Sequence, residues 1–236
     1  MALPKISQPS FSLTIPSSGK TVRYRPFTVR EEKILLVAQS GGEKQDYIDA
    51  FKQMVTNCVL DPIDVDTLAS YDIEYIFLNL RAKSVSNVIE LKMKDEHEKE
   101  ISVSVNLDNV QVHKSTVSNK IVLDAEREIG IKMKYPTFAE IEKLSARDEN
   151  GTELDAGLDL LTSLIELIWE GESVYPASES TQKELHEFIS DFSADQIAKM
   201  QDFLNDLPYV YLDIEYTDST GEKKSRRIAG ISSFFG

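Results

Sequence analysis

The side chains that could do chemistry are mostly carboxylates: 40 Asp and Glu stand against 26 Lys and Arg, for a net charge of −14. A pair of carboxylates is the machinery of glycoside hydrolysis, in which one acts as the acid and the other as base or nucleophile. So many carboxylates form pairs by chance, and nothing in the sequence indicates the separated pKa values that the two roles need. The sequence therefore predicts no catalytic residue.

The other reactive side chains also lack the spacing that a built site needs. His97, His113 and His186 do not form the H-E-x-x-H pattern that places two nitrogens on one helical face for zinc. Cys58 is the only cysteine, lies on an apolar helical stripe, and excludes a disulfide within the chain. No dinucleotide fingerprint or nucleophile elbow occurs. We expect no metal, no cofactor and no enzymatic activity.

The acidic balance limits the classes of partner. A net charge of −14 repels phosphate backbones and anionic lipid surfaces, so we expect neither nucleic acid nor a membrane as partner. No signal peptide and no run of about 18 apolar residues is present, and the single cysteine fits a reducing cytosol. Solubility is the simplest use of the charge, with a basic partner as the alternative.

A basic segment, residues 23–32, joins an expected strand to an expected helix. Thr28 and Glu31 have the spacing of a capping box, in which the hydroxyl accepts from the Glu31 amide and the carboxylate accepts from the Thr28 amide. Arg23, Arg25 and Arg30 are candidates for binding an acidic partner, although intramolecular ion pairs are the favoured alternative. The corner is thus predicted to be fixed locally.

Hydrophobic periodicity predicts an α+β fold for the first half of the chain. An N-terminal β-hairpin is expected first, followed by three helical segments and then by central antiparallel strands. The expected elements are a hairpin over residues 11–24, helices around 28–41, 47–58 and 73–83, and strands at 88–93, 101–107, 121–123 and 129–135.

The second half is predicted to be mostly helical. Thr137 and Glu140 form a second capping pattern, and Leu154 to Ile168 form the longest apolar stripe, expected to be one central core helix. Residues 171–181 are expected to form a loop. Two C-terminal helices, around 185–189 and 197–204, then precede a terminal β-hairpin over residues 210–228, with Ser193 and Gln196 capping the second helix.

The domain division is predicted as an N-terminal α+β region, residues 1–136, and a helical region ending in a hairpin, residues 137–236. No linker or repeat marks a boundary, and the two terminal hairpins could pack near each other, so one integrated domain is the alternative.

Five segments resemble the baseplate hub family of T-even-like contractile-tailed bacteriophages, which includes hub subunits and hub assembly catalysts. They are "RPFTVREEKILLVAQS" at 25–40, "NC" at 57–58, "DVDTLASYDIEYIFLNLRAKS" at 64–84, "ISVSVNL" at 101–107 and "IAGISSFFG" at 228–236. Some relatives carry Cys-x-x-Cys pairs at the hairpin tips that match "KDEHEK" and "TDSTGEKKS". This chain has none there, so the resemblance implies no zinc site.

The resemblance implies a non-enzymatic phage tail protein in baseplate hub assembly, as a hub subunit or as an assembly factor. Its implied partners are other baseplate hub or tail proteins, in the host cytoplasm or the virion baseplate, and its oligomeric state is open. A hub-associated cell-wall hydrolase is the alternative. Phe234 and Phe235 are further candidates for partner binding, as a docking peg, although closing the protein's own core is the favoured reading.

Overall fold

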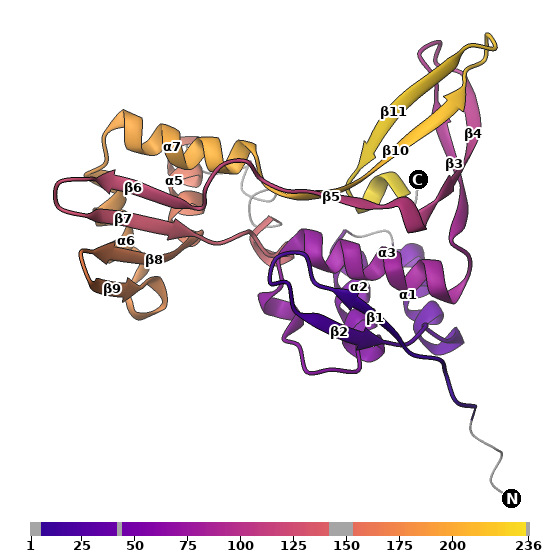
Figure 1. Ribbon diagram of the computed structural model, residues 1–236, viewed down its shortest axis with the longest axis horizontal. Coiled ribbons are helices and arrows are strands. Elements are labelled where there is room, and N and C mark those ends of the chain that lie inside the picture. Colours follow the sequence, from indigo (N-terminus) through magenta and orange to yellow (C-terminus); the bar gives the residue numbers. More distant parts are fainter. Residues whose placement is uncertain (1–5, 42–43, 142–152, 235–236) are drawn as a thin grey trace, which may run out of the picture. The chain divides into compact units, whose positions relative to one another are not determined.

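The computed structural model of the chain describes residues 6–41, 44–141 and 153–234 (Figure 1). The fold is α+β, as predicted, with short antiparallel sheets and helices. The chain divides into two compact units: unit 1 contains residues 1–113 and 209–236, and unit 2 contains residues 114–208. Unit 1 is therefore built from both ends of the chain, which differs from the expected regions 1–136 and 137–236.

Unit 1 begins with the predicted hairpin and continues with the three predicted helices. The hairpin strands pair in antiparallel register, with Leu13 opposite Val22. The bounds are β1 (Phe11–Thr14), β2 (Thr21–Tyr24), α1 (Val29–Gly41), α2 (Lys44–Cys58) and α3 (Ser70–Ser84), with a short 3-10 helix η1 (Val65–Thr67) before α3.

The core of unit 1 forms where the apolar stripes of α2 and α3 meet the hairpin. Met54, Phe77 and Tyr24 are all buried, and the rings of Phe51 and Phe77 lie 4.5 Å apart. Cys58 is buried in the same core, where removal from water raises the pKa of its thiol to about 11. The interpretation of Cys58 as a buried apolar residue is confirmed.

Two further hairpins complete unit 1. The central pair consists of β3 (Val88–Lys94) and β4 (Glu100–Asn106), and the C-terminal pair consists of β10 (Tyr209–Thr217) and β11 (Lys223–Ala229). A short strand that the sequence did not reveal, β5 (Gln111–His113), pairs with β10, so that the strand order is β11-β10-β5. The 3-10 helices η2 (Leu107–Asn109) and η4 (Ile231–Phe234) follow β4 and β11.

Unit 2 is a four-stranded antiparallel sheet packed with helices. Its strands, in sheet order, are β6 (Lys120–Asp124), β7 (Ile129–Met133), β8 (Ile165–Glu170) and β9 (Ser173–Pro176). Its helices are α5 (Glu153–Ser163), α6 (Gln182–Ser190) and α7 (Ala194–Asn205), with the short η3 (Ala177–Glu179) after β9.

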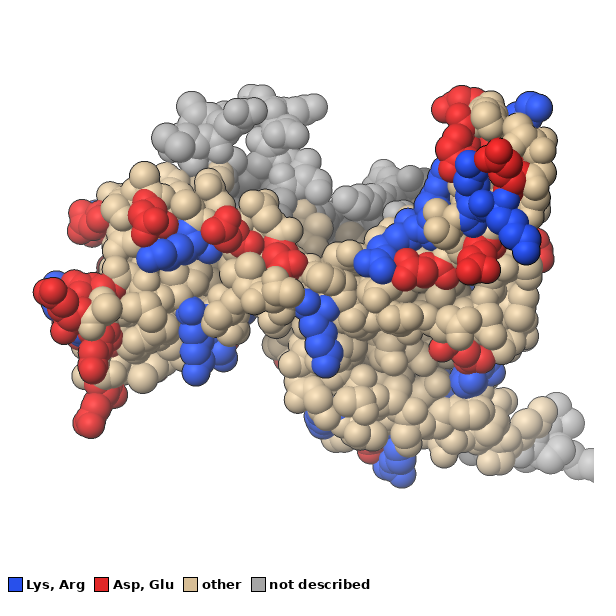
Figure 2. Space-filling model, turned by 45° about the horizontal axis from the view of Figure 1, so that its top comes forward, with Lys and Arg blue, Asp and Glu red and all other residues tan. Residues whose placement is uncertain are grey.

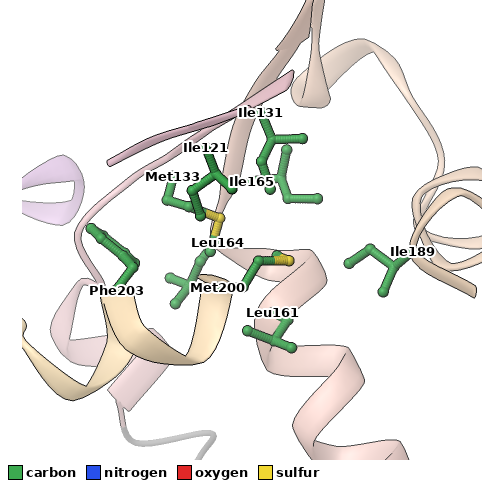
Figure 3. Packing of buried hydrophobic residues seen from close by; sticks show 9 residues of the cluster. All are labelled: Ile121, Ile131, Met133, Leu161, Leu164, Ile165, Ile189, Met200 and Phe203. Atoms are coloured by element: carbon green, nitrogen blue, oxygen red, sulfur yellow. The ribbon is translucent and has the colours of Figure 1, made fainter. Parts of the chain in front are cut away.

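The core of unit 2 lies between this sheet and these helices. Figure 3 shows Ile131 and Met133 of β7 pointing toward Met200 and Phe203 of α7, and all four side chains are buried. Leu164, which follows α5, is also fully buried among them. The unit therefore has a hydrophobic core of its own.

The predicted core helix over residues 154–168 is wrong beyond Ser163, because α5 ends there and β8 begins at Ile165. The stripe fits a helix by spacing alone, but β8 pairs with β7 from Ile165 to Glu170 and with β9 from Leu167 to Glu170. Residues 167–170 are therefore paired on both edges, which satisfies their backbone groups. The loop predicted over residues 171–181 is also wrong in part, since Ser173–Pro176 forms the edge strand β9.

Candidate partner-binding surface

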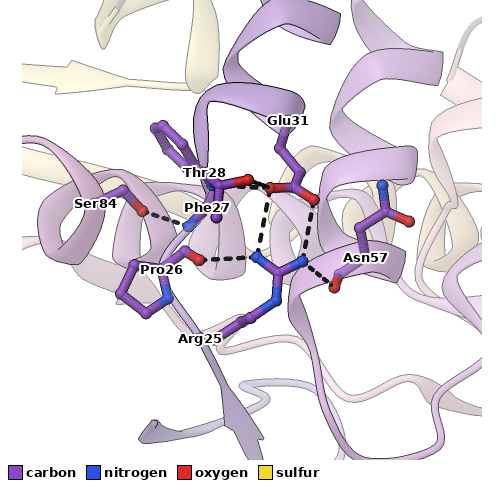
Figure 4. A network of polar contacts seen from close by, with 7 residues as sticks. All are labelled: Arg25, Pro26, Phe27, Thr28, Glu31, Asn57 and Ser84. Atoms are coloured by element: carbon purple, nitrogen blue, oxygen red, sulfur yellow. Dashed lines mark hydrogen bonds and ion pairs between the residues drawn. The ribbon is translucent and has the colours of Figure 1, made fainter. Parts of the chain in front are cut away.

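Arg25 and Glu31 form an ion pair at the corner between β2 and α1 (Figure 4). Arg25 Nη2 donates to Glu31 Oε1 at 3.0 Å and to the carbonyl oxygen of Asn57 at 3.0 Å. Its Nη1 donates to the carbonyl oxygen of Pro26 at 3.0 Å. The guanidinium thereby joins the end of β2, the first turn of α1 and the end of α2.

Thr28 completes the environment of the Glu31 carboxylate. Its backbone N–H donates to Glu31 Oε2 at 2.8 Å, as predicted, and its hydroxyl donates to the same oxygen at 2.6 Å. The partner of the hydroxyl is thus the carboxylate and not the predicted Glu31 amide. Burial favours the neutral form of Glu31, but the hydrogen bonds from Arg25 and Thr28 outweigh burial and lower its pKa to about 2.

The C-terminal end of α3 also holds this corner. The backbone N–H of Phe27 donates to Ser84 Oγ at 2.8 Å (Figure 4). The Ser84 hydroxyl donates in turn to the carbonyl oxygen of Leu80. Three helices and the first hairpin therefore meet at one network of polar contacts. Such a network fixes the direction in which α1 leaves the hairpin.

The three candidate arginines have different environments. Arg23 pairs with Asp61 at 2.8 Å, and Arg25 is engaged as described above. Arg30 is exposed on α1, and no ion pair of Arg30 occurs within residues 6–41, 44–141 and 153–234. A partner-binding role for these arginines stays a prediction, and among the three Arg30 is the one with no ion pair to a described carboxylate.

Helix α1 exposes an apolar face beside Arg30. Val29, Leu36 and Val37 expose 79%, 57% and 63% of their surface, although the helix is buried elsewhere at Glu31 and Ala38. At roughly 100° per residue, these three residues fall with Arg30 and Lys33 on one side of the helix. We call Val29, Arg30, Lys33, Leu36 and Val37 the α1 face.

The α1 face was not identified from the sequence, in which the consecutive apolar residues 34–38 give the helix a broad apolar side. Five consecutive apolar residues cover more than one face of a helix, so the sequence itself indicates that some of them are exposed. The α1 face contains two cations and no carboxylate in a chain of net charge −14, and the exposed Glu32 lies at its border, one turn before Leu36. Such a face suits a partner surface that combines apolar and acidic residues.

The C-terminal aromatic residues divide between described and undescribed parts of the chain. Phe234, at the end of η4, is buried with 2% of its surface exposed, whereas Phe235 lies outside the described residues. The arrangement of Phe234 supports the reading in which its ring closes the protein's own core. A docking role for Phe234 and Phe235 stays a prediction.

The tips of the two later hairpins of unit 1 are joined by one carboxylate. Asp95 Oδ1 accepts from the amides of His97 and Lys99 within its own turn, and Oδ2 accepts from the amide of Ser219 in the turn between β10 and β11. The hydrogen bonds from Ser219, Lys99 and His97 lower the pKa of Asp95 far below its usual range. We call this contact the hairpin clasp, and no local sequence pattern revealed it.

One carboxyl group of the described residues differs from the others in the direction of its pKa shift. Asp72 is the one carboxyl group in that part of the chain whose pKa is clearly raised, and burial is the cause. It is fully buried, and its Oδ1 accepts from the amide of Ser17 at 2.9 Å. Within the same residues no group of side chains could hold a metal ion, and no helix is long and apolar enough to cross a membrane.

Comparison with known families identifies the class of protein: the family described as T4 bacteriophage base plate protein matches residues 8–236. The chain belongs to this family. No curated protein and no solved structure matches the chain. The resemblance found in the sequence is thereby confirmed for the base plate of T4-like phages.

Proposed function

We propose that this base plate protein acts without catalysis in the assembly of the base plate hub, by binding another hub or tail protein through the α1 face. The exposure of Val29, Leu36 and Val37 on a helix that is anchored at its first turn carries the proposal. An anchored helix loses little conformational freedom on binding, and apolar residues at the centre of an interface supply most of its affinity.

The non-enzymatic part of the proposal is supported by the state of the carboxylates. A general acid has to reach its substrate, and Asp72, the described carboxyl with a raised pKa, is buried against the first hairpin. The cell-wall hydrolase alternative therefore has no observation in its favour.

The role as a transient assembly factor is favoured over a retained hub subunit. A net charge of −14 keeps a free form soluble, and the α1 face is small compared with the extensive apolar interfaces of permanent complexes. Work in the host cytoplasm during assembly follows from this role. Mass spectrometry of purified virions tests it, because a stoichiometric amount in the particle identifies a retained subunit.

The α1 face itself is tested by complementation of a phage that lacks this protein. Leu36→Ser with Val37→Ser removes apolar surface from a solvent-exposed position, so we expect normal folding and at least a tenfold loss of assembled base plates. Val122→Ser with Val174→Ser is the matched control, since these side chains are also about half exposed but belong to unit 2. Equal assembly with both double variants would contradict a role for the α1 face.

A further inference from the structure

Strand β11 forms an open edge of the sheet in unit 1. The sheet order is β11-β10-β5, so within the described part of the chain β11 has a neighbouring strand on one side only. It pairs with β10 over seven residues, from Lys223 opposite Thr217 to Ala229 opposite Tyr211. Its other side carries the row of backbone groups that an added strand pairs with.

The register identifies which backbone groups of β11 point outward. Bonds just beyond each end of the strand, from Asp218 N–H to the Glu222 carbonyl oxygen and from Gly230 N–H to the Val210 carbonyl oxygen, place the hydrogen-bonded pairs at even-numbered residues. Hydrogen-bonded and non-hydrogen-bonded pairs alternate along an antiparallel ladder. The N–H and C=O groups of Lys223, Ser225, Arg227 and Ala229 therefore point away from β10.

Most of these outward-pointing backbone groups form no hydrogen bond within the described part of the chain. The carbonyl oxygen of Ala229 accepts from the Ser233 hydroxyl at 2.7 Å, so η4 caps one end of the edge. Among the described residues, the outward backbone groups of Lys223, Ser225 and Arg227 have no hydrogen-bond partner. Because alternate residues point outward, these three positions span five residues of β11, which is the length of a short added strand.

The side chains of this edge are basic. Residues 223–227 read Lys-Lys-Ser-Arg-Arg and contain four of the 26 Lys and Arg residues of a chain with net charge −14. Figure 2 shows Lys and Arg side chains gathered along the β10–β11 hairpin, with Asp and Glu beside them. Within that group, Lys224 pairs with Glu222 at 2.7 Å, and Arg226 donates to the carbonyl oxygen of Lys94 at 3.0 Å.

Contacts with neighbouring side chains fix the position of Arg227 on the exposed face of β11. Arg227 donates to both carboxylate oxygens of Asp213 at 2.8 Å, and its guanidinium lies 3.9 Å from the ring centroid of Tyr211. A fixed guanidinium retains hydrogen-bonding capacity toward a second carboxylate. Lys223, on the same face, has no ion pair in the described part of the chain.

Charges on an edge strand normally prevent indiscriminate strand pairing. The charged side chains of β11 are all positive, so they repel a basic strand and attract an acidic one. A neutral strand would place apolar side chains against the ammonium and guanidinium groups. Because side chains alternate along a strand, an added strand with frequent carboxylates meets Lys223 and Arg227 on one face and Lys224 and Arg226 on the other.

We propose that the β11 edge binds an extended acidic segment of a partner protein as a fourth strand of the sheet β11-β10-β5. Backbone hydrogen bonds to Lys223, Ser225 and Arg227 hold the segment. Lys223, which has no ion pair among the described residues, and the guanidinium of Arg227, which keeps capacity for a second carboxylate, select for an acidic segment. The cap by Ser233 on Ala229 limits the segment to the part of the edge nearest the hairpin tip. This surface is separate from the α1 face, and the proposal does not depend on the role in hub assembly.

The probe for this proposal is an eight-residue peptide of the repeat Glu-Glu-Val-Val, which carries carboxylates on both faces of a strand. It is compared with a twin in which lysine replaces glutamate and with a form N-methylated at every residue. Hydrogen exchange on the full-length protein is the readout. In the free protein, the amides of residues 224, 226 and 228 are protected by the ladder, and those of 223, 225 and 227 exchange fast. We expect the acidic peptide to slow exchange at 223, 225 and 227 at least tenfold, and the two other peptides to have no effect.

Ser225→Pro tests the edge from the protein side. The Ser225 N–H points outward, so proline removes no ladder bond but blocks an added strand. Ser225→Ala is the matched control and keeps the N–H. We expect loss of peptide binding for the proline variant alone, with protection at Arg226 showing that the hairpin is intact.

Three results would overturn the proposal: no protection by the acidic peptide, equal protection by the lysine twin, or protection by the N-methylated form. The N-methylated peptide leaves the protein unchanged, so it decides the question even where the proline variant disturbs the hairpin.

Discussion

The carboxylate of Glu31 is almost completely buried. It stays ionised because Arg25 and Thr28 donate hydrogen bonds to its two oxygens. The folded-state pKa of about 2 lies below the ordinary value of 4.5. A depressed carboxyl pKa stabilises the folded state above the unfolded-state pKa, and this stabilisation is lost as the pH falls through the folded-state value. Glu31 therefore contributes fully at neutral pH and loses its contribution between about pH 4.5 and pH 2.

Glu31→Gln tests this contribution. The variant keeps the size of the side chain but leaves Arg25 without a counter-charge, so we expect a lower melting temperature at pH 7. We also expect the difference from the wild type to shrink as the pH is lowered from 4.5 toward 2, measured by circular dichroism. A difference that stays constant over that range would show that the ion pair does not stabilise the corner.

Asp72 has the opposite behaviour. Burial raises its pKa, and its Oδ2 has no hydrogen-bond partner among the described residues. A raised carboxyl pKa stabilises the folded state most at acidic pH, and the stabilisation is lost as the pH rises through the ordinary and then the folded-state value. The carboxylate charge of Asp72 is therefore a destabilising feature at neutral pH.

Asp72→Asn removes this charge and keeps an oxygen to accept from the Ser17 amide. We expect the variant to melt at a higher temperature than the wild type at pH 7, and the advantage to disappear below about pH 3.8, the ordinary pKa of an aspartate. Asp72→Ala is the control, because it also removes the acceptor and should melt lower. A lower melting temperature for Asp72→Asn at pH 7 would contradict the assignment.

Within the sheet of unit 2, strands β7 and β8 pack closely at a glycine. Gly130 pairs with Trp169 across the two strands, and a Cβ atom at Gly130 would lie 2.1 Å from the Trp169 ring. The ring therefore lies over the glycine backbone and fills the space that a side chain at that position would take. This pairing helps to fix the register of β8, which the apolar spacing of its sequence does not define.

Gly130→Ala should destabilise unit 2, because the added methyl group forces the indole away from β7. Overpacking of this kind costs about 1–3 kcal/mol. Trp169 is the only tryptophan, so its fluorescence reports both the displacement and the unfolding of unit 2. Gly157→Ala on α5 is the matched control, since a Cβ atom there meets no atom within 4 Å. Equal stability of the two variants would show that the indole moves aside freely.

The elements that the sequence predicted correctly are those with strong local signals. Both terminal hairpins, α2, α3 and the Ser193–Gln196 capping box follow from periodicity and capping residues within a few positions of each other. The Thr181–Glu184 box has the same signature and was overlooked beside the expected loop. Strand β9 was missed because four residues ending in proline carry too little pattern to be distinguished from a loop.

The candidate sites were harder to predict, because they depend on contacts between distant residues. The hairpin clasp joins Asp95 to Ser219, and Arg23 pairs with Asp61 in a segment that carried no signal of its own. Such contacts are decided by the tertiary fold and leave no periodic trace. The open edge of β11 likewise follows only from the strand order and not from the composition of the strand.

The chain leaves unit 1 at the end of β5 and re-enters it at the start of β10. His113 of β5 and Tyr209 of β10 are opposite each other in the sheet, with ring centroids 4.8 Å apart. Everything between them belongs to unit 2. A two-residue turn joins antiparallel strands, so Asn-Gly in place of residues 114–208 should connect β5 directly to β10.

We expect this shortened chain to fold cooperatively, with the same exchange protection in β10 and β11 as the full-length protein. A fragment of residues 1–136 is the comparison, and it should fail to fold because it lacks β10, β11 and η4. Thermal denaturation and hydrogen exchange measure both. Cooperative folding of the 1–136 fragment alone would favour the division of the chain at residue 136.

The closing of unit 1 by residues 209–234 also sets an order of events on the ribosome. The segment 114–208 takes about 5–20 s to synthesise at roughly 5–20 residues per second, and during that time β5 has no neighbouring strand. Unit 2 thus leaves the ribosome whole before the sheet of unit 1 can be completed. A nascent or truncated chain never forms the β11 edge, so only finished molecules are able to offer that edge to a partner.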